Sequence, residues 1–379
     1  MVDFEHRLSN LKALGIYRSL EQGKGIDFAS NDYLGFSKNE AIRDQLLKFM
    51  KTSYSLGSTG SRLVSGNFKE MEEIENFISE IFQSESSLYF GSGYLANLGV
   101  LSSIGGEDTE FFSDEYNHAS IIDGIRLSKS IFKVFKHNDS VELEQFLQKS
   151  TAKRKIIISE SIFSMEGDQA PVEILEKLAE KFNAYLILDE AHATGTCGPD
   201  GLGLAFTLKW NRVLSIHTCG KALGGYGAFV CCSMEMKEFL INHARSFIFT
   251  TAPAPFMVAQ TRFALTEFIT KKSHFCKLTE NVEFSKNLFQ KHGLMHTGTH
   301  IVPFIVGSSH QAVLLAQSLQ AAGIFSKAIR FPSVPENSAR LRLTLKSFHT
   351  GKQIRFLCDY LEKFQLEQLL QKEFKCISS

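Results

Sequence analysis

Three stretches decide the fold: KIIISESIFSMEGD (155–168), YLILDEAH (185–192) and VLSIHTCGK (213–221). Each begins with a short apolar run, and the segments between the runs have the apolar spacing of amphipathic helices. Apolar strands that alternate with helices are typical of a mostly parallel sheet that helices cover on both faces. We therefore predict an α/β fold, with further strands such as AFVCC (228–232) in the same sheet.

The segments on either side of this region have a different pattern. The chain starts with a helix-like stretch that leads into FASNDYLGF (28–36). A long charged helical stretch (268–293) precedes two short strands, HIVPFIVG (300–307) and ARLRLTL (339–345). We predict three parts: an N-terminal helical segment over 1–34, a large α/β domain over 35–265 and a smaller α+β domain over 266–379.

Composition narrows the class of protein. The 379 residues include 41 basic and 41 acidic side chains, so the overall charge favours neither nucleic acid nor an anionic membrane as a partner. The seven cysteines form no C-x-x-C pair and suit a reducing compartment. The start does not resemble a signal peptide, and no apolar run approaches the ~18 residues of a membrane span. We expect a cytoplasmic protein with small-molecule partners and no metal.

Polar residues follow the three apolar runs at the point where each strand ends. They include Ser164 in the first stretch, Asp189 and His192 in the second, and Thr218 and Lys221 in the third. Parallel strands deliver their carboxyl ends to one edge of a sheet, and ligands of such sheets bind there. The sequence therefore predicts a ligand site at this edge.

Each of these residues also has an ordinary structural interpretation. Lys221 lies among small residues in TCGKALGG, where a partly desolvated amine is a usable nucleophile, but a surface lysine in a glycine turn is commoner. Asp189 has no basic neighbour in sequence, so it needs a cation such as a protonated pyridine, unless it only caps a helix. His192 could bind a phenolic oxygen or be an ordinary loop histidine.

Other segments give weaker signals. Gly93 and Tyr94 open a predicted helix whose N–H groups could hold a phosphate, although glycine turns before helices are common without a ligand. His118 could stack on an aromatic ring or cap a helix. Thr250 and Thr251 could bind phosphate or organise a turn before prolines. The Asp-Glu-Ala-His run also occurs in helicases, but the phosphate loop G-x-x-x-x-G-K-[ST] that they need is missing.

The motifs taken together resemble the α-oxoamine synthases, a family of fold-type I enzymes that use pyridoxal 5′-phosphate. The similarity extends from about residue 31 to about residue 345. The motifs that carry it, in chain order, are SNDYLG (30–35), GSRLVSG (60–66), GYLAN (93–97), His118, FSMEGD (163–168), DEAH (189–192), TCGK (218–221) and RLRLT (340–344).

The resemblance implies a role for each matching residue. Lys221 would carry the cofactor as a Schiff base and later act as the base for the α-proton, and Asp189 would pair with the pyridine nitrogen. His192 would bind the phenolic oxygen, and His118 would stack on the ring. The remaining implied contacts are Gly93, Tyr94 and Thr218 near the phosphate, Ser164 beside the ring, Thr250 and Thr251 at the phosphate of the neighbouring subunit of a homodimer, Arg330 and Asn31 at the amino-acid carboxylate, and Arg18 near the acyl substrate.

The implied reaction is the decarboxylative condensation of an amino acid with an acyl thioester. GSRLVSG and AIRFPSVP (328–335) favour the branch that joins L-alanine to a pimeloyl thioester, of coenzyme A or of a carrier protein, in biotin synthesis. The branches that use glycine with an acetyl or succinyl thioester, or serine with a palmitoyl thioester, stay open. A catalytically silent binding subunit is a further alternative, but such a subunit has no chemical need for Lys221.

Overall fold

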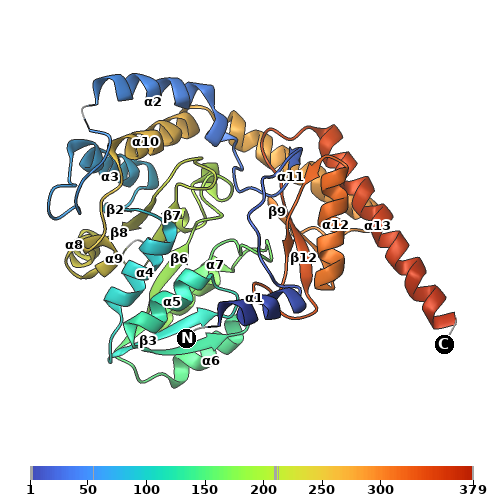
Figure 1. Ribbon diagram of the computed structural model, residues 1–379. Helices are drawn as coiled ribbons and strands as arrows, with labels where there is room; N and C mark the ends of the chain where they lie inside the picture. The colour runs from blue at the N-terminus through green and yellow to red at the C-terminus, as the bar shows by residue number, and fades with distance from the viewer. Residues whose placement is uncertain (1–2, 54, 209–210, 212, 378–379) are drawn as a thin grey trace. The chain divides into compact units, whose positions relative to one another are not determined.

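The computed structural model describes residues 3–53, 55–208, 211 and 213–377, which fall into two compact units. The larger unit comprises residues 32–164 and 169–276, and the smaller one comprises residues 1–31, 165–168 and 277–379. Each unit is described by itself below (Figure 1).

The larger unit contains a seven-stranded sheet in the order β2-β8-β7-β6-β5-β3-β4. Strands β7, β6, β5, β3 and β4 pair in parallel, whereas β8 is antiparallel to both of its neighbours. This confirms the predicted, mostly parallel sheet. The bounds are β2 Ser86–Phe90, β3 Thr109–Asp114, β4 Ile131–Phe135, β5 Arg154–Glu160, β6 Tyr185–Asp189, β7 Val213–Thr218 and β8 Ala228–Cys232.

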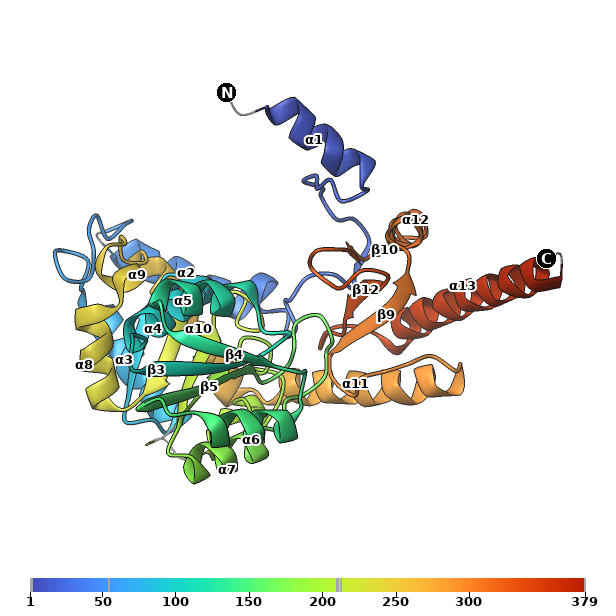
Figure 2. The same ribbon diagram turned by 90° about the horizontal axis from the view of Figure 1, so that it is seen from below.

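The strands are apolar almost throughout because both faces of the sheet are covered. Along β5, Ile156 and Ile158 enter one core with residues of α4, α5 and α8, whereas Ile157 enters a second core with residues of α6 and α7. Figure 2 shows α4 and α5 on one face of these strands and α6 and α7 on the other. The helices are α2 Glu40–Thr52, α3 Lys69–Phe82, α4 Gly93–Ile104, α5 Ala119–Ser128, α6 Ser140–Lys149, α7 Val172–Lys181, α8 Met234–His243, α9 Arg245–Ile248 and α10 Pro255–Thr270.

The register of the sheet brings the polar strand ends together. Glu160 of β5 is paired with Asp189 of β6, which is paired in turn with Ile216 of β7. The residues that follow these three strands therefore lie at one edge of the sheet, as predicted from the sequence.

The smaller unit has a three-stranded antiparallel sheet in the order β11-β12-β9 and a two-stranded parallel pair, β1-β10. Buried Leu341 and Leu343 of β12 and Leu315 of α12 contribute to its core. No described helix of either unit is long and apolar enough to cross a membrane. The bounds are α1 Phe4–Ala13, β1 Ile26–Asp27, α11 Ser273–Lys291 (whose first four residues belong to the larger unit), β9 Ile301–Gly307, α12 Ser309–Ala321, β10 Ile324–Phe325, β11 Ala328–Ile329, β12 Ala339–Thr344 and α13 Gly351–Ile377.

Candidate active site

Lys221 and His192 meet at the carboxyl edge of the large sheet. Lys221 follows β7, His192 follows the neighbouring strand β6, and Lys221 Nζ lies 2.8 Å from His192 Nε2. The hydroxyl of Tyr33, a fully buried residue, lies 2.7 Å from the other ring nitrogen of His192, Nδ1. The lysine amine thus lies beside a buried imidazole, and the Tyr33 hydroxyl holds the other ring nitrogen of that imidazole.

The turn around Lys221 is built from glycines, but only some of them leave open space. A Cβ at Gly224 would lie 2.3 Å from Ser37 N, and one at Gly225 would lie 1.7 Å from Gln260 Oε1. These two glycines therefore allow the turn to pack closely against Ser37 and Gln260. A Cβ at Gly220 would approach nothing closer than 3.7 Å. The free space next to the lysine is therefore on the side of Gly220.

Asp189 is a buried carboxylate that accepts two neutral hydrogen bonds. Asn97 Nδ2 donates to Oδ2 at 2.7 Å and Ala191 N donates to Oδ1 at 2.9 Å. No lysine or arginine of the described part of the chain forms an ion pair with it. Since a buried charge normally needs an opposite charge, this carboxylate fits a ligand that brings its own cation, such as a protonated pyridine ring.

His118 is the N-cap of α5 and lies near Asp189. Its Nδ1 lies 2.8 Å from Ser120 Oγ and also accepts the backbone N–H of Ser120. Burial lowers the pKa of His118, an effect that the charge of Asp189 only partly offsets. The side chain is therefore neutral near pH 7, and a neutral imidazole suits a flat contact with an aromatic ring.

The N-terminus of α4 lies beside the end of β7. Gly93 begins this helix, and a Cβ placed there would lie 3.6 Å from Thr218 Oγ1. Gly220 N donates to the same hydroxyl at 3.4 Å. The half-exposed Tyr94 donates its hydroxyl to Asp123. Backbone N–H groups at a helix start together with a threonine hydroxyl make a suitable environment for a phosphate.

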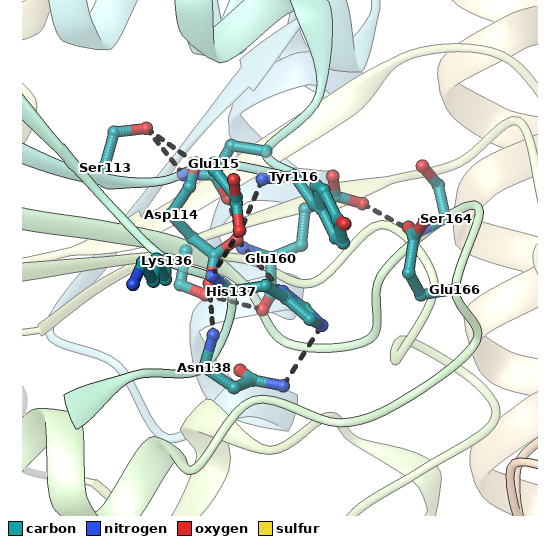
Figure 3. Close-up of polar contacts among 12 residues, drawn as sticks. Ser113, Asp114, Glu115, Tyr116, Lys136, His137, Asn138, Glu160, Ser164 and Glu166 are labelled. Atoms are coloured by element: carbon teal, nitrogen blue, oxygen red, sulfur yellow. Dashed lines mark hydrogen bonds and ion pairs between the residues drawn. The ribbon is translucent and has the colours of Figure 1, made fainter. Parts of the chain in front are cut away.

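Ser164 is held in place by the network in Figure 3. Ser164 N donates to Oε2 of the buried Glu160 at 3.1 Å. The preceding Phe163 meets the ring of His137 edge-on at 4.3 Å, and His137 Nδ1 lies 3.0 Å from Oδ1 of the buried Asp114. Side chains from the ends of three strands thus fix the loop that carries Ser164.

Among the described residues, no hydrogen bond joins Thr250 or Thr251 to the other predicted cofactor residues. They lie between α9 and α10, and Thr251 is exposed. The next residue, Ala252, donates its N–H to Gly60 O at 3.0 Å, which ties this segment to the glycine-rich stretch 57–66. Their expected role at the cofactor of a second subunit stays a prediction.

The three predicted substrate residues all belong to the smaller unit. Arg330 donates to the carbonyls of Gly15 and Tyr17, and Arg18 Nη2 donates to Ser333 Oγ at 3.1 Å. Asn31 Oδ1 accepts a hydrogen bond from Arg342 Nη1 at 2.9 Å. Arg342 lies in the motif RLRLT (340–344), but no role was assigned to it from the sequence. Contacts of these side chains with an amino-acid or acyl substrate stay a prediction.

Several supporting residues were not recognised from the sequence. Tyr33 and Asn97 lie inside recognised motifs without an assigned role, and Ser120 follows His118 by two positions. Glu190 is fully buried and accepts hydrogen bonds from Ser161 Oγ, Leu204 N and Ala205 N at 2.6 to 2.9 Å. Burial raises the pKa of Glu190 to about 7. Only its position next to Asp189 could have drawn attention to it.

Comparisons with known proteins bear on this site. The family model described as aminotransferase class I and II matches residues 23–361. A protein of Lysinibacillus sphaericus named 8-amino-7-oxononanoate synthase is 38% identical over 345 residues, which cover 90% of this chain and 88% of the relative.

Two solved structures extend the comparison. The 8-amino-7-oxononanoate synthase of Francisella tularensis is 27% identical, with a TM-score of 0.78 over 91% of this chain and 99% of that one. The serine palmitoyltransferase of Sphingomonas wittichii is 25% identical, with a TM-score of 0.87 over 95% of each chain.

Proposed function

Because the chain belongs to the aminotransferase class I and II family, in its α-oxoamine synthase branch, we propose that it joins an amino acid to an acyl thioester with loss of CO₂. The cofactor is pyridoxal 5′-phosphate, and the residues at the sheet edge fit it. The observation that carries the proposal is the pairing of Lys221 with His192, beside a buried Asp189 that has no cationic partner in the described chain.

Each residue at the sheet edge has a part in this chemistry. Bound pyridoxal phosphate supplies a sink for the electron pair that remains when Cα of the amino acid loses a proton. Lys221 would hold the cofactor through its amine, and the same amine, when free, would take this proton. Asp189 balances the positive charge of the ring nitrogen, His192 donates to the phenolic oxygen, and the neutral His118 covers one face of the ring.

The other predicted residues complete the proposal. Gly93, Tyr94 and Thr218 hold the phosphate, and Ser164 lies beside the ring. Arg330 grips the amino-acid carboxylate, because a guanidinium can donate two parallel hydrogen bonds to it. Asn31 assists Arg330, Arg18 engages the acyl substrate, and Thr250 and Thr251 serve the second subunit of a cytoplasmic homodimer.

For the substrates, we propose L-alanine and a pimeloyl thioester, with 8-amino-7-oxononanoate, CO₂ and the free thiol as products. The support is the name of the relative at 38% identity. A second candidate is the condensation of serine with a long-chain acyl thioester, which is favoured by the TM-score of 0.87 to the serine palmitoyltransferase of Sphingomonas wittichii.

A substrate panel tests the proposal. Purified protein with pyridoxal phosphate is mixed with alanine, glycine or serine and with acetyl, succinyl, pimeloyl or palmitoyl thioesters, and thiol release is measured. We expect turnover with alanine and the pimeloyl donor. Turnover restricted to serine with palmitoyl, or to glycine with a short donor, would overturn the substrate assignment but leave the reaction class intact.

Covalent trapping tests the role of Lys221 without any turnover. Borohydride reduction of the protein with bound cofactor, followed by peptide mass spectrometry, should place the added mass on Lys221. Lys221→Ala should carry no added mass and have no turnover. A reduced adduct on another lysine of the wild-type protein would refute the assignment of the cofactor lysine.

A further inference from the structure

We propose that Asn97 is a positioning residue that fixes two groups facing the cofactor, the carboxylate of Asp189 and the imidazole of His118, through one branched hydrogen-bond chain. The inference rests on the proposed function insofar as that supplies the cofactor. It concerns a side chain that has no other role in the site described above.

The first branch runs directly to Asp189. Asn97 lies on α4, one turn after Gly93, and is almost completely buried. Its Nδ2 donates to Asp189 Oδ2 at 2.7 Å. The amide cannot be turned over, because its oxygen would then face the oxygen of a carboxylate. The carboxylate therefore fixes which end of the amide points toward it, and the amide fixes the carboxylate.

The second branch reaches His118 through Ser120. The same Nδ2 donates to Ser120 Oγ at 3.0 Å, so this hydroxyl accepts from Asn97 and has its own proton left to donate. The proton is directed at His118 Nδ1, 2.8 Å away, which also accepts Ser120 N. With Nδ1 as an acceptor, the neutral imidazole carries its proton on Nε2. The chain thus sets the tautomer and orientation of His118.

The side-chain oxygen of Asn97 supports a role for this residue at the cofactor site. Asn97 Oδ1 is buried and has no hydrogen-bond partner among the described residues. Leaving a buried acceptor unpaired destabilises a protein, so Asn97 is poorly explained as a residue that serves folding alone. Its two donor contacts both lead to groups predicted to face the cofactor.

The chain has a consequence for the bound cofactor. A hydrogen bond to an ionised carboxylate stabilises the charged form, so Asn97 helps Asp189 to keep a proton on the pyridine nitrogen. That positive charge disfavours a second proton on the imine nitrogen formed with Lys221. Without Asn97 the ring carries less positive charge, and the pKa of the imine nitrogen should rise.

The test is a pH titration of the visible absorbance of the protein with bound cofactor, a readout that needs no turnover. Asn97→Ala should move the midpoint upward by about one pH unit, comparable to the loss of one hydrogen bond to a charged group. Its affinity for pyridoxal phosphate, measured by equilibrium dialysis, should fall about tenfold. Ser120→Ala removes only the branch to His118 and should leave the midpoint within about 0.2 units of wild type.

Asn281→Ala is the matched control. Asn281 is a buried asparagine of the smaller unit that donates to the carbonyls of Lys346 and His349 at 2.8 and 2.9 Å. Its loss should lower stability but leave the midpoint unchanged. If Asn97→Ala does not fold, the nearly isosteric Asn97→Leu decides. It fills the same space without a hydrogen-bond donor and adds no charge, so it should raise the midpoint in the same direction.

The outcomes separate this inference from the proposed function. A folded Asn97 variant whose midpoint shifts no more than that of Asn281→Ala overturns the inference and leaves the function standing. Wild-type protein that develops no visible absorbance with pyridoxal phosphate overturns the proposed function and the inference with it. An upward shift confined to the Asn97 variants supports the branched chain.

Discussion

Replacement of Glu75 by alanine should lower the free energy of unfolding of the larger unit by about 3–5 kcal/mol. Glu75 lies on α3 with 3% of its side chain exposed. It accepts hydrogen bonds from Arg62 Nη1 at 2.7 Å, from Lys237 Nζ at 3.1 Å and from the backbone N of Tyr89 at 2.9 Å. One carboxylate thus joins the segment 57–66, α8 and β2.

The magnitude follows from the groups that the substitution leaves behind. The side chains of Arg62 and Lys237 are only 9% and 18% exposed, so neither regains full hydration when the carboxylate is removed. Removal of one partner of a buried ion pair typically costs about 3–5 kcal/mol, and the N–H of Tyr89 loses its acceptor as well. Glu75→Gln keeps one acceptor and should cost less than Glu75→Ala.

Urea denaturation followed by circular dichroism measures the effect, and Glu80→Ala is the control. Glu80 is an exposed glutamate on the same helix, and its replacement should change the free energy of unfolding by no more than about 0.5 kcal/mol. A loss below about 1 kcal/mol for Glu75→Ala would refute the reasoning, because it would mean that both cations find water or other partners at little cost.

Three further predictions concern pH and backbone conformation. Burial lowers the pKa of His217 to about 3, so between pH 6.5 and 3 the unfolded chain takes up a proton that the folded chain does not. The free energy of unfolding should therefore fall by up to about 1.4 kcal/mol per pH unit as the pH is lowered. Urea denaturation at several pH values measures this slope, and His217→Gln should lack this part of it. Thr59 has a φ of +55°, which is unfavourable for a β-branched residue. Thr59→Gly should therefore raise the free energy of unfolding by about 0.5–1 kcal/mol. A lower melting temperature for this variant would contradict the inferred backbone strain at Thr59. Gly224 has a φ of +60° and no room for a Cβ, whereas Gly220 has room for one. Thermal unfolding should show Gly224→Ala destabilised by at least about 1–2 kcal/mol and Gly220→Ala nearly unchanged. Equal effects would contradict the conclusion that Gly224, but not Gly220, is needed for packing of the turn around Lys221.

Local pattern predicted the parts of this protein that depend on a few neighbouring residues. The apolar runs at 155–159, 185–188 and 213–217 became β5, β6 and β7, because strands covered on both faces must be apolar at successive positions. The carboxyl ends of parallel strands share one edge, so the sequence also indicated that residues after these strands, such as Asp189 and Lys221, would lie near one another.

The supporting contacts needed the folded chain. Tyr33 reaches His192 across 159 positions, and Asn97 reaches Asp189 across 92, and no periodicity carries information over such separations. Two of the glycines after Lys221 proved to serve close packing against Ser37 and Gln260, which only the fold brings near. The sequence by itself determined the strands, their polar ends and the family motifs, because these follow from local chemistry. The tertiary structure decided which buried groups orient the reactive ones, because hydrogen bonds of 2.7 to 2.8 Å depend on the placement of several elements at once.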